Sequence, residues 1–119
     1  MRPSTEPRHP RRGEVWLADF NPGRGSEQKG VRPALVVQND VGNQYAATTI
    51  VAAITTTIKP YPVTVVVRAR TCGLPHDSMV NMAQVLTIDK ARLIKKLGEL
   101  TPEQLEAVNR ALRISLDLT

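Results

Sequence analysis

Apolar and polar residues follow one another along the first two thirds of the chain in short stretches that are typical of β-strands. Five stretches are predicted as strands: 13–20, 34–38, 49–55, 63–67 and 78–86, the last with a kink or bulge before residue 83. Residues 39–43 and 60–62 are typical of turns. Residues 21–30 form a rather long polar loop with several glycines, and long ordered loops are often functional.

The clearest helix is expected over residues 101–116. Thr101 is a good N-cap, Pro102 suits the first helical position, and Gln104 completes a capping box. Leu100 and Leu105 occupy the positions of a hydrophobic staple. The apolar stripe expected to pack on the sheet consists of Leu105, Val108, Leu112 and Leu116. We expect this helix to be scaffold, without a chemical role.

Short strands followed by a terminal helix predict an α+β fold, a small curved antiparallel sheet or barrel with helical cover. We expect a single domain over residues 13–119, without internal repeats. Residues 1–12 are rich in Arg and Pro and are expected to form a disordered basic arm rather than a secretory signal. No apolar run approaches the length needed to span a membrane.

The composition limits the chemistry that the chain can perform. Aromatic residues are only 3% of the 119, so the core must rest on Val, Ile, Leu and Ala. Cys72 is the only cysteine, which excludes an internal disulfide and fits a reducing cytosol. With His9 and His76 as the only histidines, few residues remain for a metal site, and we expect neither metal nor cofactor.

The net charge of +5 is compatible with a polyanionic partner. The arm carries +3 of this charge, which leaves only +2 for the domain. Charge alone therefore fits a soluble protein with a basic tail as well as it fits a nucleic-acid-binding protein.

The loop and strand entry at residues 23–33 combine three cations with a carboxylate, a hydroxyl and an amide. Arg32 precedes Pro33, which favours an extended backbone and suits a side chain that holds a phosphate. The alternative is a structural ion pair of Arg32 with Glu27 or Asp40. His76 is a possible general base, but a single histidine in a turn is more often a surface residue.

The sequence resembles the MazF/PemK family, the toxins of type II toxin–antitoxin modules. The similarity extends over about residues 12–118, and Lys29 is a departure, since the family often has glycine there. The motifs that carry it are 12–16 (RGEVW), 25–28 (GSEQ), 32–40 (RPALVVQND), 49–55 (TIVAAIT), 77–78 (DS) and 84–90 (QVLTIDK).

The resemblance implies an SH3-like barrel of the MazF/Kid/CcdB type that forms a homodimer in the cytoplasm. It also implies sequence-specific, metal-independent cleavage of single-stranded RNA. In the family the ribose 2′-hydroxyl attacks the neighbouring phosphorus, which leaves a 2′,3′-cyclic phosphate (or a 3′-phosphate) and a 5′-hydroxyl. The catalytic arginine and threonine of the family fall on Arg32 and Thr55. From the residues alone, Thr55 is not distinguished from Thr56 or Thr57.

By the same resemblance, eight residues are expected to contact RNA: Ser26, Glu27, Gln28, Asn39, Tyr61, Pro62, Ser78 and Gln84. For each of them, an ordinary turn or surface position is the alternative. The expected inhibitor is a MazE-like antitoxin with an acidic segment that folds into the same groove. DNA is not expected to bind the toxin alone. Two other functions remain open, because this fold also hosts inhibitors of DNA gyrase and RNA-binding modules without catalysis.

Overall fold

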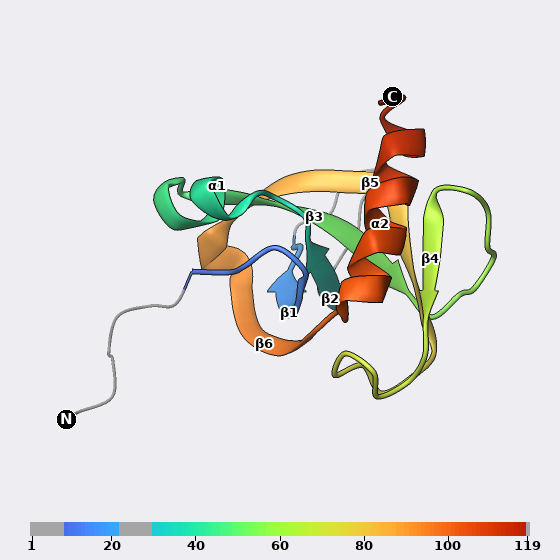
Figure 1. Cartoon of the computed structure of the whole chain (residues 1–119). Coiled ribbons are helices and arrows are strands. Elements are labelled where there is room, and N and C mark those ends of the chain that lie inside the picture. The colour runs from blue at the N-terminus through green and yellow to red at the C-terminus, as the bar shows by residue number, and fades with distance from the viewer. Residues whose placement is uncertain (1–8, 22–29, 119) are drawn as a thin grey trace.

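The computed structural model describes residues 9–21 and 30–118 (Figure 1). Within these residues, six strands, two α-helices and one 3₁₀ turn follow one another along the chain. In order they are β1 (Glu14–Asp19), β2 (Val31–Val36), α1 (Asp40–Tyr45), β3 (Thr48–Thr55), β4 (Thr64–Val67), β5 (Ser78–Asp89), η1 (Lys90–Arg92), β6 (Leu93–Glu99) and α2 (Pro102–Ser115). None of the helices in this part of the chain is long and apolar enough to cross a membrane.

The strands form one sheet in the order β4-β5-β3-β2-β1-β6, and every neighbouring pair is antiparallel. β5 curves across the sheet, and α2 packs against β4 and β5 (Figure 1). The expected curved antiparallel sheet with a helical cover is confirmed.

Two apolar clusters lie on the two faces of this sheet, because successive side chains of a strand point to opposite sides. Leu35 of β2 joins Val108 of α2 in the larger cluster. Val36, its neighbour, joins Phe20 and Ile88 in the smaller cluster on the other face. Leu, Val, Ile and Ala supply most of both clusters, as the low aromatic content requires.

Helix α2 begins as the sequence predicts. Thr101 Oγ1 accepts the N–H of Gln104, and Gln104 Oε1 accepts the N–H of Thr101, which completes the capping box. Of the expected staple, Leu100 belongs to the larger cluster and Leu105 packs against it. The expected stripe is wrong at its end, because Leu116 is 56% exposed. The helix ends at Ser115, so Leu116 lies outside it and does not continue the apolar face that packs on the sheet.

A close backbone contact brings the segment after β4 against the edge strand β6. A Cβ built on Gly73 would lie 1.9 Å from the carbonyl oxygen of Leu97, and one on Gly98 would lie 2.3 Å from that of Cys72. Only glycine permits such an approach. The contact joins the two margins of the curved sheet through glycines that are 25 positions apart in sequence.

The turn expected at residues 39–43 is instead the start of α1. Asn39 Oδ1 caps this helix by accepting the N–H of Gly42. Asn43 is fully buried, and its amide donates to the carbonyl oxygen of Gln38 while its Oδ1 accepts the hydroxyl of Thr49. These tertiary contacts stabilise a helix of six residues. The sequence does not predict it, because its residue types are ones that favour turns.

Strand β6 and the bulge in β5 can each be compared with the sequence pattern. The pattern does not predict strand β6, since Lys95 and Lys96 interrupt its apolar alternation, a composition that suits the edge of a sheet. The bulge in β5 is confirmed. Ala52 lies opposite Val85, whereas the next residue, Ala53, lies opposite Asn81.

Pro10 and Arg12, near the end of the expected arm, contact the folded domain. Pro10 is buried, and the N–H of Arg12 donates to Asp40 Oδ1 over 2.7 Å. The guanidinium of Arg12 also donates to the carbonyl oxygen of Val37 and to Asn109 Oδ1. Residues 1–8 of the expected arm lie outside the described part of the chain.

Candidate active site

The register of β2 on β3 brings the two expected catalytic residues together. Ala34 lies opposite Ala53, and Val36 lies opposite Val51. Arg32 and Thr55 each lie two residues beyond the last of these pairs, Ala34 with Ala53, so the same register continued would place them opposite each other. Residues directly opposite in an antiparallel pair present their side chains on the same face. Two positions 23 residues apart in sequence thus become neighbours on one side of the sheet.

The Thr55 side chain is held in one orientation. Its Oγ1 accepts the N–H of Thr57 over 3.0 Å, just after the end of β3. A hydroxyl that accepts one hydrogen bond still has its own hydrogen to donate. Thr55 is half-buried and Arg32 is exposed, whereas Thr56 and Thr57 are exposed and lie beyond the strand. The register therefore favours Thr55 among the three threonines.

Asn81 extends this face, although the sequence analysis does not single it out. It lies opposite Ala53 on β3 and Thr64 on β4, on the same side of the sheet as Thr55. Its Oδ1 accepts the hydroxyl of Tyr61 over 3.3 Å and the N–H of Ala83 over 2.9 Å. Because both bonds use the oxygen, the amide N–H groups are left to donate elsewhere. An amide side chain with two apolar residues on each side of it in the strand is the signal that could have found it.

The turn before β4 presents Tyr61 beside Asn81. The N–H of Tyr61 donates to Thr64 Oγ1, and that hydroxyl donates back to the carbonyl oxygen of Tyr61 over 2.7 Å. Tyr61 is 48% exposed, and Pro62 is exposed next to it. Gln84 is also exposed and lies in the bulge of β5, three residues after Asn81. These expected RNA contacts therefore gather near the Arg32–Thr55 pair.

Two of the other expected contacts, Asn39 and Ser78, do not lie on this face. Asn39 follows the far end of β2 from Arg32, where it caps α1. Ser78 is only 3% exposed, and its hydroxyl donates to the carbonyl oxygen of His76. Ser26, Glu27 and Gln28 lie outside the described residues. The side chain of His76 is exposed in the turn before β5, as expected for a surface histidine.

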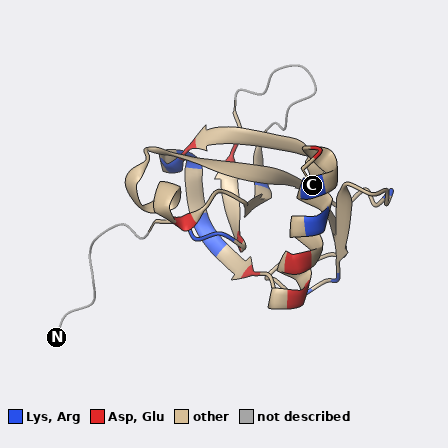
Figure 2. Cartoon of the chain, turned by 45° about the horizontal axis from the view of Figure 1, so that its top comes forward, with Lys and Arg blue, Asp and Glu red and all other residues tan. Residues whose placement is uncertain are grey.

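Charges on α2 are mixed, which agrees with the scaffold role expected for this helix. Figure 2 shows acidic and basic residues along it, and Arg110 and Arg113 both approach Glu106 within 4.0 Å. Within residues 9–21 and 30–118, no group of three or more His, Cys, Asp or Glu is placed to hold a metal ion. The chemistry available at the described face is therefore that of a guanidinium, a hydroxyl and side-chain amides.

Comparison with known proteins identifies the family. Residues 11–116 match the model of the PemK-like, MazF-like toxins of type II toxin–antitoxin systems. The chain belongs to this family. It is 47% identical over 110 residues to Endoribonuclease EndoA of Bacillus subtilis (strain 168), covering 91% of this chain and 95% of that protein.

Solved structures of PemK/MazF toxins share the fold. An endoribonuclease in complex with its cognate antitoxin from Mycobacterial species superposes with a TM-score of 0.79 at 30% identity, over 92% of this chain and 97% of that one. MazF (Form-I) from Deinococcus radiodurans gives a TM-score of 0.80 at 26% identity, over 93% and 99%. The family and the fold type inferred from the sequence motifs are confirmed.

Proposed function

We propose that this PemK/MazF toxin is an endoribonuclease that cleaves single-stranded RNA with Arg32 and Thr55 as its catalytic residues. The observation that carries the proposal is the β2–β3 register, which places a cation and a hydroxyl on one face of the sheet. Its 47% identity to a protein named as an endoribonuclease supports the same activity.

The reaction uses a nucleophile that the substrate itself contains, so it needs no metal-bound water. The 2′-oxygen loses its proton and bonds to the adjacent phosphorus, while the bond from phosphorus to the 5′-oxygen breaks. The departing oxygen takes up a proton. The products are a 2′,3′-cyclic phosphate, which can open to a 3′-phosphate, and a 5′-hydroxyl.

Arg32 stabilises the negative charge that grows on the non-bridging oxygens as the phosphorus becomes five-coordinate. A guanidinium suits this task because it is always charged and its planar N–H groups match two phosphate oxygens at once. Thr55 orients the phosphate or the 2′-hydroxyl. Its oxygen is already bonded to the N–H of Thr57, so the hydroxyl hydrogen is the group it offers to the substrate.

Sequence is read by side chains around this pair. Single-stranded RNA is recognised through splayed bases that stack on aromatic rings and bond to amides. Tyr61 with Pro62 supplies the stacking surface, and Asn81 and Gln84 supply amides. By the family resemblance, Ser26, Glu27 and Gln28 contact the RNA as well. Asn39 lies at the far end of β2 from this pair, so its contact with RNA rests on the family resemblance alone.

The activity is held in check by a cognate MazE-like antitoxin in the cytoplasm. Its acidic segment occupies the face that carries Arg32 and thereby blocks RNA. One of the structural relatives was solved as a complex with its cognate antitoxin, which supports this partner.

The test incubates the purified protein with a long single-stranded RNA in excess EDTA and maps the ends. We expect cuts at one short motif, with 5′-hydroxyl ends. Arg32→Ala should lower kcat/KM by about 100- to 1,000-fold. Arg110→Ala removes an exposed arginine of α2 and is the matched control, expected to cut like the wild type.

Wild-type cleavage by folded Arg32→Ala would contradict the catalytic role. Intact RNA with folded, antitoxin-free wild type would overturn the nuclease. Binding without cleavage would then indicate an RNA-binding module, and inhibition of DNA gyrase would indicate the other branch of this fold.

A further inference from the structure

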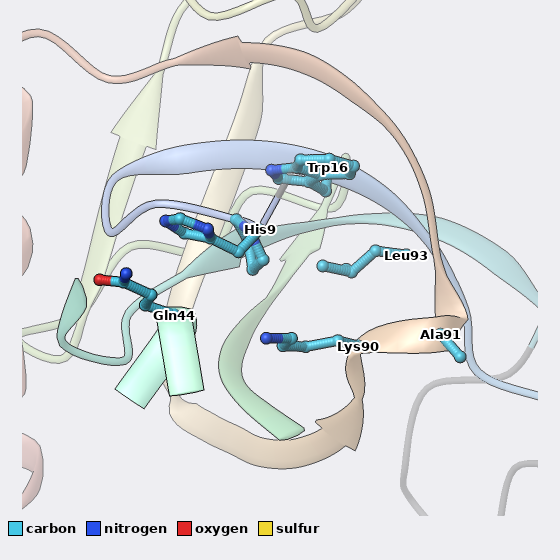
Figure 3. Close-up of a pocket in the computed structure, with 7 residues that line it drawn as sticks. His9, Trp16, Gln44, Lys90, Ala91 and Leu93 are labelled. Carbon is cyan, nitrogen blue, oxygen red and sulfur yellow. The ribbon is translucent and has the colours of Figure 1, made fainter. Parts of the chain in front are cut away.

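A cavity of about 420 Å³ opens where residues 9–10, β1, α1, η1 and the start of β6 meet. This volume is within the range of about 300–1,000 Å³ that is usual for small-molecule sites. Among the residues that the structure describes, none of the expected RNA contacts lines it. Its walls consist of His9, Pro10, Trp16, Gln44, Lys90, Ala91 and Leu93 (Figure 3).

One wall of the cavity is a fixed aromatic ring. Trp16 packs against the smaller apolar cluster, and its Nε1 donates to Glu14 Oε1 over 2.9 Å. The bond uses the only polar atom of the indole and fixes the orientation of the ring. A ring held in this way is a preformed surface for stacking on another flat ring.

The opposite wall is positively charged. Lys90 lies across the cavity from Trp16 (Figure 3), and its ammonium donates to the carbonyl oxygen of Asn43 over 2.7 Å. This bond anchors the ammonium while leaving two of its three donors for a ligand. The lining contains no carboxylate among the described residues. With Lys90 as the charged side chain of this lining, the walls favour an anion.

The cavity and the proposed catalytic pair lie on the same side of β1 and β2. Trp16 is opposite Ala34, and Ala18 is opposite Arg32, so Trp16 lies two residues along β1 from the position facing Arg32. Two residues of a strand span about 7 Å. A short stretch of single-stranded RNA is long enough to reach from one site to the other.

We propose that this cavity binds one nucleotide of the substrate RNA, outside the scissile step. Its base stacks on Trp16, and its phosphate contacts Lys90. Gln44 adds an amide for the base edge. The inference rests on the proposed function only in taking single-stranded RNA as the substrate. A peptide would satisfy the cation with an acidic side chain but would make less use of the fixed indole.

Trp16 is the only tryptophan of the chain and therefore reports on the cavity directly. The wild-type protein is titrated with 2′-O-methyl decanucleotides of A, U, C or G, which lack the attacking hydroxyl and cannot be cut. Indole emission gives stacking, and the anisotropy of a labelled copy gives overall binding. Free mononucleotides form a second arm, and a peptide rich in Glu and Leu forms a third.

We expect at least one decanucleotide to quench the indole in parallel with the anisotropy rise, and mononucleotides to quench only at much higher concentration. Trp16→Leu should weaken anisotropy-detected binding by about 5- to 100-fold. Lys90→Gln should lower the slope of log K against log salt by about 0.7, as expected for one lost phosphate contact. Lys95→Gln changes an exposed lysine of β6 outside the cavity. It should leave both the anisotropy-detected affinity and the salt slope unchanged.

Binding without quenching, or no binding of any decanucleotide, overturns the proposal. Quenching by the peptide but not by RNA also overturns it and assigns the cavity to a protein partner. Quenching by mononucleotides as strong as by decanucleotides overturns it in favour of a free nucleotide. If Trp16→Leu does not fold, the quenching of the wild-type indole and the salt slope of Lys90→Gln still test the proposal. Because these measurements use uncleavable RNA, they stand whether or not Arg32→Ala abolishes cleavage.

Discussion

The side chain of Arg12 donates a 2.8 Å hydrogen bond from Nη2 to Oδ1 of Asn109, in the middle of α2. Its Nε donates to the carbonyl oxygen of Val37 over 2.9 Å. One guanidinium thus joins the entry to β1, the residue after β2 and the C-terminal helix. The contact couples the scaffold helix to the strand that carries Arg32.

Arg12→Ala is expected to destabilise the fold by about 1–3 kcal/mol, because two part-buried acceptors lose their donor. Urea unfolding followed by circular dichroism measures this. Arg11→Ala is the matched control, since Arg11 bonds to Glu14 through its backbone N–H, which alanine keeps. A change within about 0.5 kcal/mol is expected for this control. Equal losses in the two variants would show that the guanidinium of Arg12 is not the stabilising group.

Gly73→Ala tests the backbone contact between Gly73 and β6. Gly73 has a positive φ of 82°, and a Cβ there would collide with the carbonyl oxygen of Leu97. Gly30 has a similar φ of 75°, but a Cβ added there would meet no atom within 4 Å. Gly30→Ala should therefore cost only about 1 kcal/mol. Gly73→Ala should cost about 3 kcal/mol or more, since backbone must move. Similar melting temperatures for the two variants would contradict this packing.

Glu14 gives the stability of the protein a pH dependence. Burial raises the pKa of its carboxyl, but hydrogen bonds from Trp16, the Arg11 N–H and Lys96, together with the charge of Lys96, outweigh burial and leave the pKa below its ordinary value. A carboxyl whose pKa is lower in the folded state stabilises the fold above its unfolded pKa, and this stabilisation is lost as pH falls through the folded pKa.

Glu14→Gln should therefore be less stable than the wild type at pH 7, by about 1–2 kcal/mol. The difference should begin to shrink as pH falls below about 4.5, where the carboxyl of the unfolded chain takes up a proton, and it should be lost as pH falls through the lower pKa of the folded protein. Thermal unfolding of both proteins from about pH 7 to about pH 3 measures it. A difference that stays constant across this range would rule out a contribution from the charge of Glu14.

Thr55→Val removes the hydroxyl while keeping the shape and the strand propensity. Loss of one preorganised donor at the reacting phosphate should lower kcat by about 100-fold, with a small change in KM. Single-turnover cleavage of one short RNA measures this. Thr56→Val, at an exposed position beyond β3, is the control. A larger loss in Thr56→Val would transfer the catalytic role to that residue.

Asn81→Leu tests whether the amide that sequence reasoning missed reads the RNA. Since its N–H groups are available on the face that carries Thr55, the variant should change the relative cutting of preferred and altered motifs by about tenfold. Sequencing of the cut ends measures it. Asn39→Ala is compared in parallel, because the family resemblance makes Asn39 the expected reader. An unchanged cut-site profile for Asn81→Leu would exclude it from base recognition.

The sequence by itself determines the elements whose causes are local. Helix α2 starts at Pro102 because Thr101 and Gln104 cap each other, and this geometry needs only neighbouring residues. The strands follow from apolar stretches, and the bulge of β5 follows from the polar interruption before Val85. The ordered motifs of residues 12–90 also identify the family, although they do so by resemblance rather than by physical derivation.

Tertiary structure alone decides what depends on register and on contacts between distant segments. Helix α1 exists because Asn43 is buried against Gln38 and Thr49, and β6 is a strand because β1 offers it an edge. The proximity of Arg32 and Thr55 depends on the pairing of β2 with β3, and a shift of one residue would put them on opposite faces.

The cavity is the clearest case of a feature that only the folded chain creates. Trp16 and Lys90 meet across it although 74 positions separate them, because the sheet curves and η1 folds back beside β1. Local propensity contains no information on such long-range positions, and only the packed sheet fixes them.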